Sequence, residues 1–112
     1  MHHDPIVVLI RYRALPGREE AARRELAALI GKVAAREPDC LGITMLGRPE
    51  EPAEILLHEH WTAREAYLGP HLQTPHLLEF IGRAPELFAG PPEITLWDRL
   101  GGAPAEPASA RR

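Results

Sequence analysis

The chain has 112 residues, the length of one domain, and its 13 basic and 16 acidic residues give a net charge of -3 at pH 7. Because it has no basic stripe and no RNP-like or zinc-finger pattern, we expect no nucleic-acid partner. The single cysteine, Cys40, excludes an internal disulfide and a CxxC motif, and it fits a reducing compartment.

The hydropathy of the chain does not indicate a membrane or export segment. No apolar run approaches the roughly 20 residues of a membrane-spanning helix. The first residues include His2, His3 and Asp4, which differ from the basic start of a signal peptide. We therefore expect a cytoplasmic protein with no membrane partner.

The first predicted elements are a strand and a helix. Ile6 to Arg13 is a β-branched and apolar run that is apolar on both faces, as in a strand covered on both sides. From Arg18 to Arg36 the apolar residues recur at helical spacing, and Pro38 stops the pattern. This second region is predicted to be a helix with one buried stripe.

Two antiparallel strands are predicted next, at Cys40 to Gly47 and at Ile55 to Trp61. A polar, proline-bounded loop, Arg48 to Pro52, separates them. Thr62 is predicted to cap a short helix, because Glu65 follows it at the spacing of a capping box.

A further helix is predicted to begin at Thr74 and Pro75, since threonine is a favourable N-cap and proline suits the first helical position. Glu93 to Leu100 is predicted to be the last strand, so residues 1–100 form the domain. Residues 101–112 are rich in glycine, proline and alanine, and we expect them to be a disordered tail.

The order of these elements, β-α-β-β-α-β, predicts an α+β fold: a ferredoxin-like sandwich with a four-stranded antiparallel sheet and both helices on one face. The other face of the sheet is then bare, although the first strand is apolar on both sides. A second copy of the sheet is the economical cover, since most homo-oligomers close as two-fold dimers. We therefore expect a homodimer with the architecture of a dimeric α+β barrel.

The stretch from Glu54 to His76 holds four of the six histidines and is the predicted active-site segment. Strand alternation separates two faces within it. One face carries Ile55, Leu57, Glu59 and Trp61, and the other carries Leu56, His58 and His60. A carboxylate in an apolar row must find a partner, keep its proton at a raised pKa, or face a cavity. Glu59 is therefore a candidate functional residue.

An alternative function follows from the second face. His58 and His60 lie at i,i+2, and Glu65 follows His60 at a spacing seen in cupin-like metal sites. In a dimer interior, a two-fold axis would gather the imidazoles of both copies. HxH pairs are nevertheless common by chance, so our expectation is that no metal is bound.

Five segments resemble the antibiotic biosynthesis monooxygenase family, which includes quinol monooxygenase-like proteins. They are RYRALPGREE, EPDCLG, HEHWTAREAY, HLQTPHLLEF and GPPEITLWDRL, and together they extend over nearly the whole chain from Ile6 to Leu100. The resemblance implies the dimeric barrel. It also implies that dioxygen is used, without metal, flavin or haem cofactor, to oxygenate a small phenolic, quinol or polycyclic aromatic substrate.

The chain also departs from particular branches of that family. The anthrone-oxidising branch carries polar pocket residues at the positions of Leu57, Met45 and Ile81, so its polyketide substrates are disfavoured here. The haem-degrading relatives carry their haem-ligating histidine at the position of Phe80, so haem degradation is disfavoured as well.

For the site itself, the family has a histidine at the position of His71. We predict that Glu59 hydrogen-bonds to His71 on the helix-facing side of the sheet, and that His71 removes the phenolic proton. His76 is the alternative base. The residues predicted to contact the substrate are Trp61, Tyr67, Met45, Leu57 and His76. A dimer that binds a small apolar ligand without catalysis, or an isomerase-type relative, is the alternative use of the same pocket.

Overall fold

The structure, a computed structural model, describes residues 5–103. Its strands are β1 (Ile6–Arg13), β2 (Cys40–Arg48), β3 (Glu51–Trp61) and β4 (Glu93–Asp98); its helices are α1 (Glu19–Arg36), α2 (Arg64–Leu68) and α3 (Pro75–Arg83), with 3-10 turns η1 (Pro70–Gln73) and η2 (Ala84–Glu86). The predicted strands and helices are therefore confirmed in type and order. Most of the predicted tail, residues 104–112, lies outside the described residues. None of the described helices is long and apolar enough to span a membrane.

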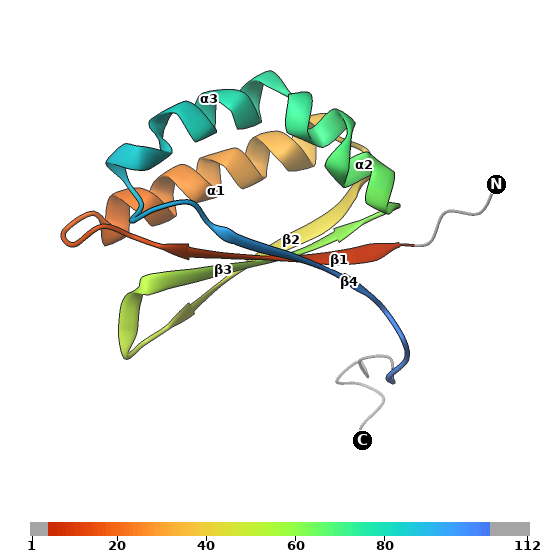
Figure 1. Cartoon of the computed structure of the whole chain (residues 1–112), viewed down its shortest axis with the longest axis horizontal. Helices are drawn as coiled ribbons and strands as arrows, with labels where there is room; N and C mark the ends of the chain where they lie inside the picture. Colours follow the sequence, from red (N-terminus) through yellow and green to blue (C-terminus); the bar gives the residue numbers. More distant parts are fainter. Residues whose placement is uncertain (1–4, 104–112) are drawn as a thin grey trace.

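The described strands form one antiparallel sheet in the order β2-β3-β1-β4. All the helices lie over the same face of this sheet, and the opposite face is open (Figure 1). β1 and β3 are the inner strands, and β1 pairs with β3 on one edge and with β4 on the other. This arrangement is the predicted ferredoxin-like α+β sandwich.

The core fills the space between the sheet and the helices. Alternate residues of β1 point toward the helices, and Val8 among them is fully buried. The buried stripe of α1 faces them, and Leu26 is likewise fully buried. The stripe consists of Ala22, Leu26, Leu29 and Val33, whereas Ile30, which the helical spacing also placed in it, is only partly buried.

The structure corrects the predicted helix caps. α2 begins one residue later than expected, with Ala63 at the N-cap, and Thr62 instead donates its hydroxyl to Asp39 Oδ1 (2.8 Å). Thr74 does occupy the N-cap position of α3, but its hydroxyl donates to the carbonyl of His71 (2.9 Å) and caps no helical N–H. The Thr62 hydroxyl therefore links two loops, and the Thr74 hydroxyl stabilises turn η1, which the sequence analysis did not predict.

The strand ends also differ from the prediction. Arg48 pairs with Glu51, so the polar loop between β2 and β3 contains only Pro49 and Glu50. β4 ends at Asp98, two residues before the predicted end. Backbone pairing with β1 sets that limit, since Asp98 pairs with Ile6, the first residue of β1.

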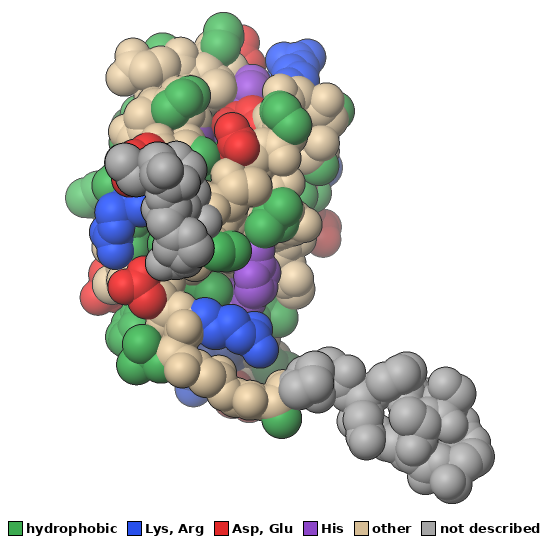
Figure 2. Space-filling model, turned by 90° about the vertical axis from the view of Figure 1, so that its right-hand side faces the viewer, with side chains coloured by type: hydrophobic (Ala, Val, Ile, Leu, Met, Phe, Trp, Pro, Cys, Tyr) green, Lys and Arg blue, Asp and Glu red, His purple; other side chains and the backbone are tan. Residues whose placement is uncertain are grey.

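The open face of the sheet carries the residues that alternate with the core. Val7 lies between His60 of β3 and Trp97 of β4, and Leu9 lies between His58 and a threonine of β4. The side chain of Trp97 is half exposed, as is Leu46 of β2. Hydrophobic and histidine side chains also reach the surface on the side of the molecule that is at the right in Figure 1 (Figure 2). Apolar surface of this kind on a small domain indicates an interaction face.

We propose that a second copy of the chain covers the open face, so light scattering at low micromolar concentration is expected to give twice the mass of one chain. Trp97→Asp, which puts a charge among the apolar residues of that face, is expected to shift the protein to the monomer. Leu78→Asp is the matched control, because Leu78 has a similar exposed fraction but lies on α3. A folded monomer of the unmodified chain would contradict the proposal.

Candidate active site

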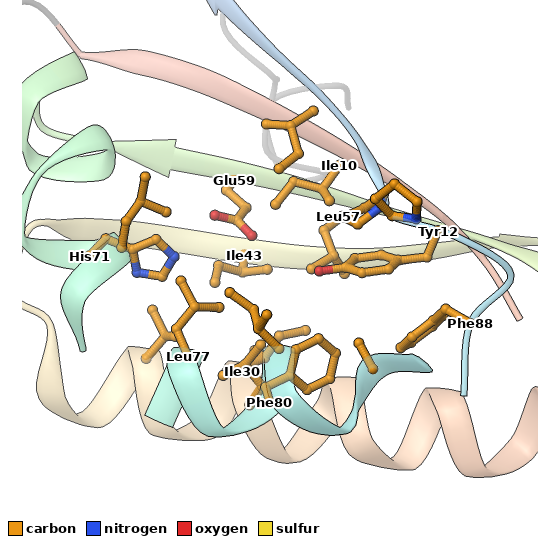
Figure 3. Close-up of a pocket in the computed structure, with 18 of the residues that line it drawn as sticks. Ile10, Tyr12, Ile30, Ile43, Leu57, Glu59, His71, Leu77, Phe80 and Phe88 are labelled. Carbon is orange, nitrogen blue, oxygen red and sulfur yellow. The ribbon is translucent and has the colours of Figure 1, made fainter. Parts of the chain in front are cut away.

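A cavity of about 550 Å³ lies between the sheet and the helices α1 and α3. Most of its lining is aliphatic or aromatic, and the polar side chains on it, among the described residues, are Tyr12, Glu59, Tyr67 and His71. Figure 3 shows the Glu59 carboxylate and the His71 imidazole toward one end and the rings of Tyr12 and Phe88 toward the other. The cavity has the size and the apolar lining of a small-molecule site with a few convergent polar groups.

Glu59 is on the helix-facing side of β3, as the family resemblance implied, and shares that face with Trp61, as the strand alternation predicted. Its exposed fraction is 3%, and its Oε1 accepts a hydrogen bond from Trp61 Nε1 (2.8 Å). Burial raises the pKa of Glu59 from its ordinary 4.5 to about 7, with a smaller increase from the negative charge of Glu37, while the bond from Trp61 lowers it. Glu59 therefore exchanges a proton near neutral pH.

The predicted hydrogen bond between Glu59 and His71 is wrong. His71 Nδ1 bonds instead to Glu37, at 2.9 Å from Oε1 and 3.1 Å from Oε2. The imidazole packs against two aromatic rings, stacked on Tyr67 at 5.1 Å and tilted against Trp61 at 4.6 Å between ring centroids. Burial lowers the pKa of His71, and the bond to Glu37 opposes that shift. His71 and Glu59 thus share the cavity without sharing a bond.

Glu37 is the functional candidate that the sequence reasoning missed. It follows the last residue of α1 and precedes Pro38, and a residue before proline is disfavoured in helical conformation. Its backbone is accordingly extended (φ -121, ψ 94), and its side chain is largely buried against the two histidines. The charged pattern of α1 concealed it, because its neighbours in sequence are solvent-exposed residues.

The predicted contact residues divide into two groups. Leu57 and Tyr67 line the cavity. Trp61 is fully buried behind Glu59 and His71, and it supports them instead of lining the cavity. Met45 pairs with Leu57 but borders a separate surface hollow near Arg48 and Pro49, at the hairpin end of β2.

His76, the alternative base, also lies outside the cavity lining. Its Nε2 bonds to Glu37 Oε2 (2.6 Å), on the other side of the carboxylate from His71. The helical position explains this placement, since His76 is the second residue of α3 and points back toward the end of α1. Its direct contact with a substrate is therefore not supported.

Tyr12 is a second residue of the cavity that the sequence reasoning did not select. It continues the helix-facing row of β1 and pairs with Ile55, so strand alternation alone was a sufficient signal. Its ring packs against Phe88 and Phe80, with centroids 4.7 and 6.2 Å away. Burial raises the pKa of Tyr12 and of Tyr67 well above the ordinary value, so both hydroxyls keep their protons and can donate.

The pair considered for a metal site lies elsewhere. His58 and His60 are on the open face of β3, with ring centroids 4.8 Å apart. Within residues 5–103 there is no group of three or more metal-ligating side chains arranged to hold an ion. One chain therefore offers at most this pair of imidazoles on that face.

Comparison with known proteins finds a family model and a curated relative that match this chain. A family model described as antibiotic biosynthesis monooxygenase matches residues 5–83. The uncharacterized protein sll1783 from Synechocystis sp. is 32% identical over 94 residues, which make up 84% of this chain. The chain spans only 63% of the length of that curated relative.

Solved structures agree with the fold. Rv0793 from Mycobacterium tuberculosis superposes with a TM-score of 0.78 and PA3566 from Pseudomonas aeruginosa with 0.79. Each is 27% identical to this chain, and each match covers 90% of this chain and 100% of the other. The whole length of both proteins is therefore similar to the domain described above.

The buried carboxyl of Glu59 predicts a pH-dependent loss of stability. Because its pKa is about 7 in the folded chain and 4.5 ordinarily, the unfolded chain releases the proton first as pH rises, and stability falls between those two values. Glu59→Gln removes the charge but keeps an oxygen for Trp61. It is expected to raise the free energy of unfolding by on the order of 3 kcal/mol at pH 8.

Urea unfolding of both proteins at pH 8 and pH 5, at equal protein concentration, measures this difference. The advantage of the variant is expected to fall by more than half at pH 5, where the folded protein already holds the proton. An equal gain at both pH values would assign the effect to packing and not to ionisation.

Proposed function

The chain belongs to the antibiotic biosynthesis monooxygenase family, and we propose that it is a cofactor-independent monooxygenase that uses dioxygen to oxidise a small phenol or hydroquinone. The observation that supports this proposal is the pairing of an imidazole and a carboxyl group on one apolar cavity. Burial raises the pKa of Glu59 to about 7, and it lowers the pKa of His71, which favours the neutral imidazole. Two groups adjusted in this way suit acid–base catalysis near pH 7.

The proposed reaction needs a base, a dry cavity and a proton donor. A deprotonated hydroquinone can pass one electron to dioxygen, and the two radicals combine at a ring carbon to form a peroxide. Protonation of the peroxide and loss of water leave one oxygen atom on the ring carbon. A hydroquinone and dioxygen thus give a hydroxylated quinone and water, and the substrate supplies every electron. An apolar cavity favours the neutral reactants and excludes competing water.

His71 is the proposed base. Its lowered pKa keeps the ring neutral at pH 7, so it can accept the phenolic proton. Its Nδ1 is occupied by Glu37, which leaves Nε2 as the nitrogen for the substrate. The Tyr67 ring stacked on it and the Trp61 ring tilted against it hold the imidazole in place.

Glu59 is the proposed proton donor to the peroxide. At neutral pH its pKa of about 7 leaves a substantial fraction of the carboxyl protonated. Trp61 fixes Oε1, so Oε2 is the oxygen available to the cavity. The hydroxyls of Tyr12 and Tyr67, also on the lining, can donate to developing oxygen charge.

The lining supports an amphipathic substrate. Glu59 and His71 lie toward one end, while Phe88 and the Tyr12 ring lie toward the other (Figure 3). A phenol or hydroquinone ring at the polar end would direct an alkyl group or a further ring toward Phe88. The same cavity would serve a protein that binds such a compound without oxidising it, so turnover is the decisive test.

Removal of the proposed base tests the function. His71→Ala is expected to lower kcat by roughly two to four orders of magnitude, the usual worth of a positioned general base. Glu59→Gln is expected to lower it less. Oxygen uptake by the metal-stripped protein with hydroquinones, naphthols and anthrones measures both effects.

His58→Ala is the matched control, since His58 lies on the same strand but on its open face. This variant is expected to keep the activity of the unmodified protein. Saturable binding of the phenols with no oxygen uptake would favour the binding function, and stoichiometric metal that is lost on His58→Ala would favour the metal-binding one. Full activity of His71→Ala would remove His71 as the base.

The length of an alkyl group on the substrate tests whether the far end of the cavity accepts an apolar extension. A series of hydroquinones with longer alkyl groups is expected to show KM falling roughly fourfold for each methylene that reaches the apolar end, from ~0.8 kcal/mol of burial per methylene. The trend should stop when the chain fills the cavity. Steady-state oxygen uptake gives KM for each compound, and a KM that rises from the first added methylene would contradict an apolar extension of the substrate.

A further inference from the structure

A single carboxylate joins two histidines beside the cavity. Glu37 lies within hydrogen-bond distance of His71 Nδ1 (2.9 and 3.1 Å) and of His76 Nε2 (2.6 Å). The Glu37 side chain is 10% exposed, and those of His71 and His76 are 6% and 4% exposed. The group connects the end of α1 to η1 and to the start of α3. Buried ionisable groups that contact one another in this way require defined proton positions.

The chemistry of a carboxylate fixes those positions. An ionised carboxylate accepts hydrogen bonds and cannot donate them, so each ring nitrogen that faces it must carry a hydrogen. His71 then has its proton on Nδ1 and a lone pair on Nε2. His76 has its proton on Nε2. His71 lies nearest to Oε1 of Glu37 and His76 nearest to Oε2, so rotation of the carboxylate would lengthen these contacts.

The free nitrogen of His71 faces the cavity. Nε2 has no hydrogen-bond partner within residues 5–103. Every fully buried side-chain nitrogen or oxygen in that range does have such a partner. Nε2 is therefore accessible, and the cavity is the space that His71 lines. Figure 3 shows the imidazole turned toward the interior of the cavity, on the side where Glu59 lies.

We propose that Glu37 is the positioning residue of the site: it holds His71 as the Nδ1–H tautomer, with the Nε2 lone pair presented to the substrate, and His76 locks Glu37 in that orientation. The catalytic part of this proposal rests on the proposed function. When Nε2 takes the phenolic proton, the imidazolium that forms is bonded to a carboxylate, which stabilises its charge. Glu59, on its own indole donor, stays separate from this group and free to act as the acid.

The tautomer is measured without any substrate. Long-range ¹H–¹⁵N NMR spectra of the unmodified full chain, at a pH where His71 is neutral, are expected to show a protonated Nδ1 and an unprotonated Nε2. In Glu37→Gln the amide can donate as well as accept, so the two tautomers are expected to mix. Glu25→Gln is the matched control, because Glu25 also links α1 to α3, through Arg83 (2.7 Å), but contacts no histidine.

Activity and a second variant extend the test. With any phenol that the unmodified protein oxidises, Glu37→Gln is expected to lower kcat by roughly 100-fold or more with little change in KM, as for a base in the wrong tautomer. His76→Leu should lower kcat by a smaller factor, and His76→Gln, which keeps a donor, should restore most of it. Glu25→Gln should match the unmodified protein.

The outcomes separate this proposal from the proposed function. A His71 that carries its proton on Nε2 in the unmodified protein would overturn the role of Glu37, whatever the protein catalyses. Full kcat in Glu37→Gln with a confirmed substrate would overturn it as well. Absence of oxygen uptake with all phenols would reject the monooxygenase function, while the spectra would still decide whether Glu37 sets the tautomer. If Glu37→Gln does not fold, the unmodified protein and the two His76 variants give the answer.

Discussion

The hydrogen bonds from two imidazoles to the Glu37 carboxylate are the contact on which the site depends. They connect α1, which precedes the second strand, to η1 and α3, which follow the third, so segments distant in sequence meet at one charged group. A buried charge is tolerated only when its hydrogen-bonding capacity is met, and loss of one partner costs more than an ordinary hydrogen bond. The same contact holds His71 at the cavity lining.

The two buried glutamates, Glu37 and Glu59, have different hydrogen-bond partners. Glu37 accepts bonds from two imidazoles, whereas Glu59 accepts one bond from an indole and otherwise faces apolar side chains. Burial therefore dominates at Glu59 and raises its pKa to about 7. In the proposed reaction the two glutamates have separate tasks: Glu37 is the partner of His71, and Glu59 holds a proton near neutrality.

Local sequence patterns predicted most of the fold, but they identified only part of the candidate site. The alternation in β3 put Glu59 and Trp61 on one face correctly, because the backbone sets side-chain direction in a strand, and the family resemblance identified that face as the helix side. The partner of His71 was not predictable in the same way. Glu37 and Glu59 were both available carboxylates, and the choice depends on the path of the chain after Pro38 and on the turn η1, which are tertiary features. The same alternation rule also predicts the side of the sheet on which Tyr12 lies, so Tyr12 could have been identified from the sequence.

The strand β3 carries the candidate site on one face and the proposed subunit contact on the other, so its register must be fixed. A shift of one residue would bring His58 and His60 into the core and turn Glu59 outward. The pairing with β1 prevents this, since Leu57 lies opposite Ile10 and Glu59 opposite Val8, both buried. Apolar neighbours on either side of Glu59 thus hold a residue that by itself would favour the exposed face. Glu59 therefore stays on the cavity side because the apolar pairs beside it set the register.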